Sequence, residues 1–121
     1  MIFNEAVECA GKENLKNIQS ERLAKLVKYV YKHSPIYKQK IDALGINPES
    51  IKSIDDIIKL PFTPKEDLRD YYPFGLFSAD IKNVAEIHVS SGTTGNPTVV
   101  GYTKKDLDLW SEVSARCIAC A

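Results

Sequence analysis

The chain has 121 residues, with sixteen basic and sixteen acidic side chains and therefore a formal net charge of zero. Balanced charge gives no overall field that would attract nucleic acid or an anionic membrane, and this length suffices for one modest hydrophobic core. The first residues lack a basic leader region and no apolar run reaches membrane-spanning length, so we expect a cytoplasmic protein that binds neither nucleic acid nor membrane.

Two helices are predicted in the first third of the chain. Apolar residues at helical spacing predict a long amphipathic helix from about Lys12 to His33. Ser34 and Pro35 suit the N-cap and first position of a second helix, which Gly45 can terminate. The expected apolar stripe of the first helix consists of Leu23, Leu26, Val27, Val30 and Tyr31.

The middle of the chain has shorter elements. Residues 46–60 predict a polar turn followed by a short helix that is capped by Ser53. The string Thr63-Pro64-Lys65-Glu66 predicts a capping box at the start of another helix, which runs to about Asp70. Residues 71–77 are aromatic and interrupted by proline and glycine, so we expect an irregular segment that packs under a neighbouring element.

A β-hairpin and a final helix are predicted in the last third. Residues 84–89 alternate with period two, and residues 98–102 are β-branched and aromatic, which predicts an antiparallel pair. Thr103 and Asp106 predict the capped start of a helix. Its expected apolar side comprises Leu107, Trp110, Val113 and Cys117. This pattern has no stop signal before the last residue, so we expect a truncated chain.

The connection between the two predicted strands, from Ser90 to Pro97, consists mostly of glycine and hydroxyl-bearing residues. Such a loop can direct backbone and hydroxyl donors at one phosphate. Pro97 occupies the position at which a Walker-type loop, read from Gly92, needs its second glycine. The glycine spacing also excludes the dinucleotide fingerprint. An ordinary hairpin turn is the alternative interpretation.

The ordered string Ser90–Pro97 resembles the phosphate-binding signature of the adenylate-forming enzymes. The resemblance extends to phenylacetate–CoA ligases through longer stretches, which together cover nearly the whole chain. These stretches are Ser34–Tyr37, Leu60–Asp70, Tyr72–Phe77 and Ser90–Thr103.

The resemblance implies a two-step ligase reaction. The reaction is expected to depend on Mg²⁺: a carboxylate attacks the α-phosphate of ATP, pyrophosphate leaves, and the thiol of coenzyme A then attacks the acyl-adenylate. The expected acid is phenylacetate or a similar aryl carboxylic acid such as benzoate or indoleacetate. No catalytic residue is assigned. The expected nucleotide-binding residues are Ser90, Ser91, Gly92, Thr93, Thr94, Gly95 and Asn96.

The resemblance also implies the front portion of the large N-terminal domain of such an enzyme, an α+β fragment of an α/β fold. We expect a helical region over residues 1–78 and the start of the ATP-binding α/β subdomain over residues 79–121. Many superfamily members have lysine where this chain has Thr98, and close relatives often have lysine where it has Asn96. Lys104 and Lys105 are expected to be solvated residues of the last helix that do not replace these lysines beside the phosphates.

The remaining reactive residue types give no site of their own. Cys117 and Cys120 have redox-motif spacing but lie at the far end of a predicted helix, so with Cys9 we expect small helix-packing residues. His33 and His88 are isolated, so no metal site is expected. His88, two residues before the loop, is expected to be structural, with a substrate-pocket role as the alternative.

Two other functions stay open for the sequence. The chain could be a non-catalytic module that binds phosphate, nucleotide or another chain, or part of an adenylating enzyme that loads a carrier protein. For the isolated chain we expect no thioester-forming activity. Faces that are left uncovered predict a homodimer.

Overall fold

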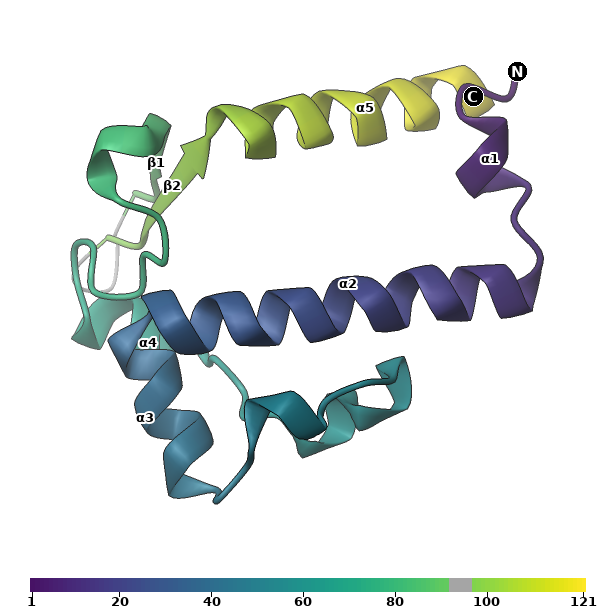
Figure 1. Ribbon diagram of the computed structural model, residues 1–121. Helices are drawn as coiled ribbons and strands as arrows, with labels where there is room; N and C mark the ends of the chain where they lie inside the picture. The colour runs from purple at the N-terminus through teal and green to yellow at the C-terminus, as the bar shows by residue number, and fades with distance from the viewer. Residues whose placement is uncertain (92–96) are drawn as a thin grey trace.

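The computed structural model describes residues 1–91 and 97–121 and consists of helices and one two-stranded antiparallel sheet. In Figure 1, α2 and α5 run along opposite sides of the molecule, the β-hairpin lies at one end, and α1 lies with both termini at the other. This composition confirms the predicted α+β class. The elements are α1 (Glu5–Glu8), α2 (Lys12–His33), α3 (Pro35–Ala43), η1 (Pro48–Ser50), η2 (Ile54–Lys59), α4 (Lys65–Asp70), η3 (Ile81–Asn83), β1 (Val84–Val89), β2 (Val99–Thr103) and α5 (Lys104–Cys120).

One hydrophobic core joins α2 to the segments that follow it. Leu23 and Val27 of α2 are buried against Ile41 of α3 and Ile51, which follows η1. Burying an aliphatic side chain of this size contributes about 1.5–3 kcal/mol, so this cluster fixes α3, η1 and η2 along one side of α2. Partly buried residues that surround it are Tyr31, Tyr37, Ile46, Ile54 and Leu60. Leu26, which we expected in the same stripe, is 56% exposed.

The local signals at α3 act as predicted. The Ser34 hydroxyl accepts a hydrogen bond from the Tyr37 backbone N–H at 3.4 Å, and Pro35 is the first helical residue. Gly45 follows the helix with φ +64°, a conformation that side chains with a Cβ rarely adopt. The long helix before it has the predicted bounds, Lys12 to His33.

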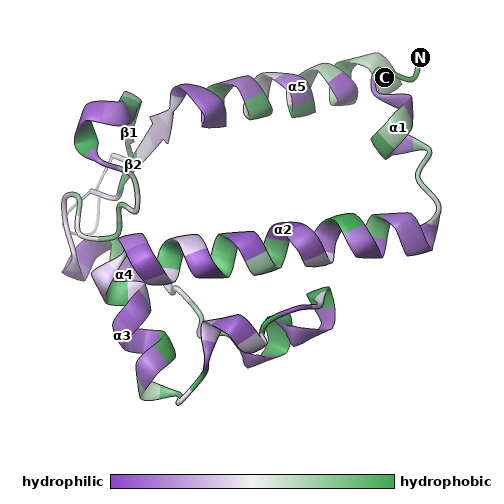
Figure 2. Cartoon of the chain, in the orientation of Figure 1, coloured by the Kyte–Doolittle hydropathy of each residue, from purple (hydrophilic) through white to green (hydrophobic). Residues whose placement is uncertain are grey.

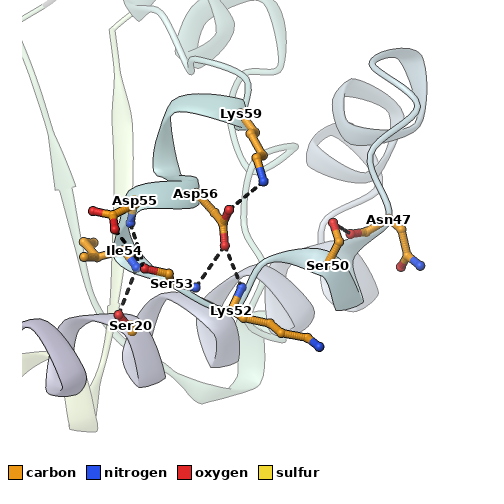
Figure 3. Close-up of polar contacts among 9 residues, drawn as sticks. All are labelled: Ser20, Asn47, Ser50, Lys52, Ser53, Ile54, Asp55, Asp56 and Lys59. Carbon is orange, nitrogen blue, oxygen red and sulfur yellow. Dashed lines mark hydrogen bonds and ion pairs between the residues drawn. The ribbon is translucent and has the colours of Figure 1, made fainter.

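The predicted short helix after residue 46 is the 3₁₀ helix η2, which is bonded to α2 (Figure 3). The Ile54 backbone N–H donates to the Ser20 hydroxyl of α2 at 2.9 Å. Asp56 accepts from the backbone N–H groups of Lys52 and Ser53 at 3.0 and 2.9 Å, and from the Lys59 ammonium at 2.6 Å. These bonds, led by the one from Lys59, hold the pKa of the Asp56 carboxyl well below its usual range.

Two local features differ from the sequence prediction. The Thr63 capping box is wrong, because α4 begins at Lys65 and its N-cap is the extended residue Pro64, which has no side-chain cap. Helix α1 was not predicted. Asn4 stabilises it by donating its backbone N–H to Glu8 and its side-chain amide to Glu112 of α5, each at 2.7 Å. None of the helices in the described ranges combines the length and apolar character needed to cross a membrane.

We predict that Asp56→Asn flattens the dependence of stability on pH. A carboxyl whose pKa is lowered by folding stabilises the folded state above its unfolded-state pKa of about 3.9, and this contribution disappears as pH falls through the lower folded-state pKa. Wild-type stability should therefore drop between about pH 5 and pH 2, and the drop should be smaller in the variant. Urea unfolding followed by circular dichroism at several pH values measures this.

The matched control is Glu66→Gln, which removes an exposed carboxylate in the first turn of α4. The control should keep the wild-type pH dependence. Equal slopes for wild type and Asp56→Asn would show that the contacts of Asp56 do not favour its charged form in the folded protein.

Candidate functional site

The predicted hairpin is present and places both ends of the glycine-rich segment at its tip. Strands β1 and β2 pair antiparallel, with Ile87 opposite Gly101 and Val89 opposite Val99, and the register shifts between Val84 and Glu86. Ser90 and Ser91 follow β1, and Ser91 is exposed. The other predicted nucleotide-binding residues, Gly92, Thr93, Thr94, Gly95 and Asn96, lie outside the described residues.

The strand ends are bonded to each other through Ser90 and Thr98. The Ser90 backbone N–H donates to the Thr98 carbonyl at 3.0 Å. The Ser90 hydroxyl accepts from the Thr98 backbone N–H at 3.0 Å and from the Thr98 hydroxyl at 2.8 Å. Sequence reasoning assigned Ser90 to the nucleotide and gave Thr98 no role. The predicted antiparallel strands were only part of the signal for this pair, because the two hydroxyl residues lie across from each other in one strand register and not in others.

One face of the hairpin packs an aromatic cluster against α5. The His88 ring lies 4.9 Å from the Tyr102 ring in an edge-on arrangement and 5.9 Å from the Trp110 ring, centroid to centroid. Tyr102 and Trp110 are 5.4 Å apart. Glu86 Oε2 is 3.1 Å from His88 Nε2. Since β1, β2 and α5 each contribute a ring, the geometry favours the structural interpretation of His88.

The other face of the hairpin rests on the aromatic segment 71–77. A Cβ placed on Gly101 would lie 2.5 and 2.6 Å from two ring carbons of Phe77 and 3.2 Å from Val84 Cγ1. Phe77 in turn lies 5.2 Å from Phe74 between ring centroids. The prediction that this segment packs under a neighbouring element is confirmed for Phe77, and glycine at 101 is what allows the ring to approach the strand.

The start of α5 has the predicted capping box. The Thr103 hydroxyl accepts from the Asp106 backbone N–H at 3.3 Å, and Asp106 accepts from the Thr103 backbone N–H at 2.8 Å. These bonds to Thr103 lower the pKa of the Asp106 carboxyl. Lys104 forms an exposed ion pair with Asp108 at 2.8 Å, in keeping with its expected role as a solvated first-turn residue.

The exposure of the cysteines corrects the prediction for them. Cys9, Cys117 and Cys120 are free thiols and all three are exposed rather than packed between helices. Figure 1 shows α5 standing apart from α2, and Figure 2 shows hydrophobic residues recurring along α5. Large exposed apolar side chains on this helix are Leu109, Trp110, Val113 and Ile118.

Two further features bear on ligands. A groove of about 530 Å³ lies between α2 and residues 57–63, with Val27, Tyr37 and Phe62 among its lining residues. Burial raises the pKa of the Tyr37 hydroxyl there. Across residues 1–91 and 97–121, no three His, Cys, Asp or Glu side chains gather in a way that could hold a metal ion.

Comparison with solved structures places this fold among the adenylate-forming CoA ligases. A 2-hydroxyisobutyryl-CoA ligase solved with 2-HIB-AMP and CoA superposes with a TM-score of 0.79 and 28% identity, over 88% of this chain and 24% of that chain. Another structure of that ligase, with R3-HIB-AMP, gives a TM-score of 0.83 over 95% of this chain and 25% of that chain. At 24% identity, this second match supports the fold alone.

Among curated proteins, the chain matches phenylacetate–coenzyme A ligases. Identity is 48% with the protein of Thermus thermophilus, over all of this chain and 27% of that protein. It is 50% with that of Aromatoleum evansii, over 94% of this chain and 26% of that protein, and 43% with that of Escherichia coli, over all of this chain and 28% of that protein. No protein-family model matches the chain.

The chain thus spans about a quarter of the length of the curated relatives it matches. The resemblance predicted from the sequence is confirmed: the chain is homologous to about a quarter of a phenylacetate–coenzyme A ligase.

We predict that Gly101→Ala destabilises the chain by about 1–3 kcal/mol, because the added methyl group overlaps the Phe77 ring and forces it to move. Urea unfolding followed by the fluorescence of Trp110, the single tryptophan, measures the change next to the hairpin. The control is Gly11→Ala, where an added Cβ meets nothing within 4 Å and only a small N-cap preference is lost. Equal effects of the two substitutions would contradict the Gly101–Phe77 contact.

Proposed function

We propose that this chain is the N-terminal part of an AMP-forming aryl–CoA ligase and that its hairpin holds the terminal phosphates of ATP. The observation that carries the proposal is the 43–50% identity to phenylacetate–coenzyme A ligases across essentially the whole chain. The structure supports it locally, since β1 and β2 bring both ends of the Ser/Thr/Gly segment together. Phenylacetate is the acid we favour.

In the proposed reaction, a carboxylate oxygen attacks the α-phosphorus of ATP and the bond to the β-phosphate bridging oxygen breaks. Pyrophosphate leaves with the electron pair of that bond. The thiol sulfur of coenzyme A then attacks the acyl carbon, AMP leaves, and the thiol proton passes to solvent. Donors at residues 90–96 would stabilise the negative charge that grows on the departing pyrophosphate. Mg²⁺ would accompany the phosphates of ATP.

The proposal divides the chain by role. Residues 1–78 form a helical region around the core of α2 and α3, and residues 79–121 begin the ATP-binding subdomain. The acid pocket, the adenine site and the coenzyme A site are assigned to the other three quarters of the ligase length. We therefore propose that the isolated chain forms no thioester and that the complete enzyme acts in the cytoplasm.

The test uses a hybrid in which this chain replaces the 121 matching residues of the Thermus thermophilus ligase. The folded hybrid should catalyse phenylacetate-dependent exchange of pyrophosphate into ATP. Replacing Thr93 and Thr94 by valine removes two candidate donors, and a charge-assisted hydrogen bond contributes about 1.5–3 kcal/mol. We therefore predict a fall in exchange rate of about 10- to 150-fold for each bond lost.

The control is Ser50→Ala, which removes an exposed hydroxyl outside both the hairpin and the groove and should leave the exchange rate unchanged. An active hybrid whose rate is the same with and without Thr93 and Thr94 would contradict the phosphate-binding role. A folded hybrid without any exchange activity would contradict the proposed reaction.

We also propose that the exposed apolar side of α5 contacts other parts of the ligase, and that the isolated chain therefore pairs with a second copy. Trp110, Val113 and Ile118 are 49%, 45% and 77% exposed. Light scattering should show a concentration-dependent dimer, which Ile118→Lys weakens. Ile58→Lys, at an 86% exposed position outside α5, is the control and should have little effect. A monomer at every concentration would contradict this pairing.

A further inference from the structure

We infer that Ser90 and Thr98 form a polar clamp that closes the base of the phosphate-binding segment, and that both act as positioning residues for ATP. This inference rests on the proposed function and goes beyond it. It changes the role of Ser90 from a group that contacts the nucleotide to one that holds the loop. It also gives Thr98 a role that the sequence motif did not suggest.

The clamp consists of three hydrogen bonds between two residues that flank the segment. The backbone pair, from Ser90 N–H to the Thr98 carbonyl at 3.0 Å, continues the ladder one step past Val89 and Val99. The return bond of a regular ladder is replaced by a side chain, because the Thr98 N–H donates to the Ser90 hydroxyl rather than to its carbonyl. The Thr98 hydroxyl donates to the same oxygen at 2.8 Å.

In this arrangement, both hydrogen-bond acceptor positions of the Ser90 hydroxyl are occupied. A serine oxygen has two acceptor lone pairs, and both are taken by Thr98 donors. Both acceptor positions of this oxygen are therefore bonded to the opposite strand. Its distance from Thr98 fixes the separation of the two chain ends from which residues 91–97 extend. A segment whose ends are fixed loses less conformational freedom when it binds a ligand, so the clamp should favour ATP binding by preorganisation.

The packing around the strands makes the clamp a rigid support. Val99, next to Thr98, is buried, and its neighbours in β2 are held by the Phe77 ring on one face and by the ring of Trp110 on the other. The two residues of the clamp are themselves exposed to partly exposed, so their hydroxyls can be replaced without opening a core cavity. This allows the clamp to be tested by side-chain deletion.

The first measurement tests whether the clamp forms in the 121-residue chain itself, and it requires no enzymatic activity. Amide hydrogen exchange at Thr98 should accelerate about 3- to 10-fold in Ser90→Ala, because its acceptor is lost. Ser90→Thr keeps the hydroxyl and should retain the protection. The amide of Val100, opposite His88 and in the next hydrogen-bonded pair of the ladder, serves as the internal reference and should change little. Unchanged exchange at Thr98 in Ser90→Ala would overturn the clamp.

The second measurement reports its effect on nucleotide binding in the hybrid ligase. Ser90→Ala and Thr98→Val should each raise KM for ATP about 3- to 10-fold, with kcat changed less than about 2-fold. The double variant should have a KM no higher than that of the more impaired single variant, because both substitutions disrupt the same set of hydrogen bonds. Thr98→Ser should restore the wild-type KM. The control is Ser111→Ala, whose hydroxyl bonds to the Leu107 carbonyl within α5 and should not affect KM.

The outcomes separate the clamp from the proposed function. If Ser90 contacts phosphate directly, Ser90→Ala will exceed Thr98→Val and their effects will multiply, which would overturn the positioning role while leaving the ligase function intact. If a folded wild-type hybrid performs no exchange, the ligase function fails and the nucleotide part of this inference fails with it. The hydrogen-exchange result then still decides whether the clamp exists.

Discussion

The pairing of β1 with β2 is the constraint on which the proposed site depends. A segment rich in glycine and small hydroxyl residues has little tendency to adopt one shape, because glycine loses more conformational freedom on ordering than any other residue. Here the segment starts and ends on adjacent strands, and Ser90 and Thr98 bond across the gap where the ladder ends. The strands thus fix the positions of the two residues between which the segment runs.

The rest of the described structure holds this hairpin in place. On one face, Gly101 lets the Phe77 ring lie directly against β2. On the other, His88 and Tyr102 pack with Trp110, which ties the strands to α5. The core of Leu23, Val27, Ile41 and Ile51 lies elsewhere, between α2 and the segments after it. The buried hydrophobic core and the candidate site therefore lie in different parts of the chain, and the aromatic segment 71–77 connects them.

Features with local causes were predictable from the sequence. The Ser34 cap, the Gly45 turn, the Thr103–Asp106 box and the alternation in β1 each depend on residues within a few positions of each other. Where a local rule failed, a stronger local rule applied: Pro64 occupies the N-cap itself and removes Thr63 from capping range. The ordered string at residues 90–97 indicated the adenylate-forming enzymes, and the longer matching stretches indicated phenylacetate–CoA ligases because long ordered strings are specific. Residues 92–96 of that string lie outside the described part.

Features that depend on distant residues were not predictable. Helix α1 is held by an amide–carboxylate bond between Asn4 and Glu112, at opposite ends of the chain. The exposure of Cys117 and Leu26 depends on which elements lie beside their helices, and helical periodicity gives the direction of a side chain without saying whether anything covers it. The pairing of Ser90 with Thr98 depends on the strand register. The alternation pattern alone does not determine which residue of one strand lies opposite which residue of the other.

The most direct measurement of the central claim is an experimental structure of the hybrid ligase with ATP bound. We expect the β- and γ-phosphates to lie within hydrogen-bonding distance of the backbone and hydroxyl groups of residues 91–96, while the Ser90 hydroxyl stays bonded to Thr98. Phosphates bound away from the tip of this hairpin would contradict it.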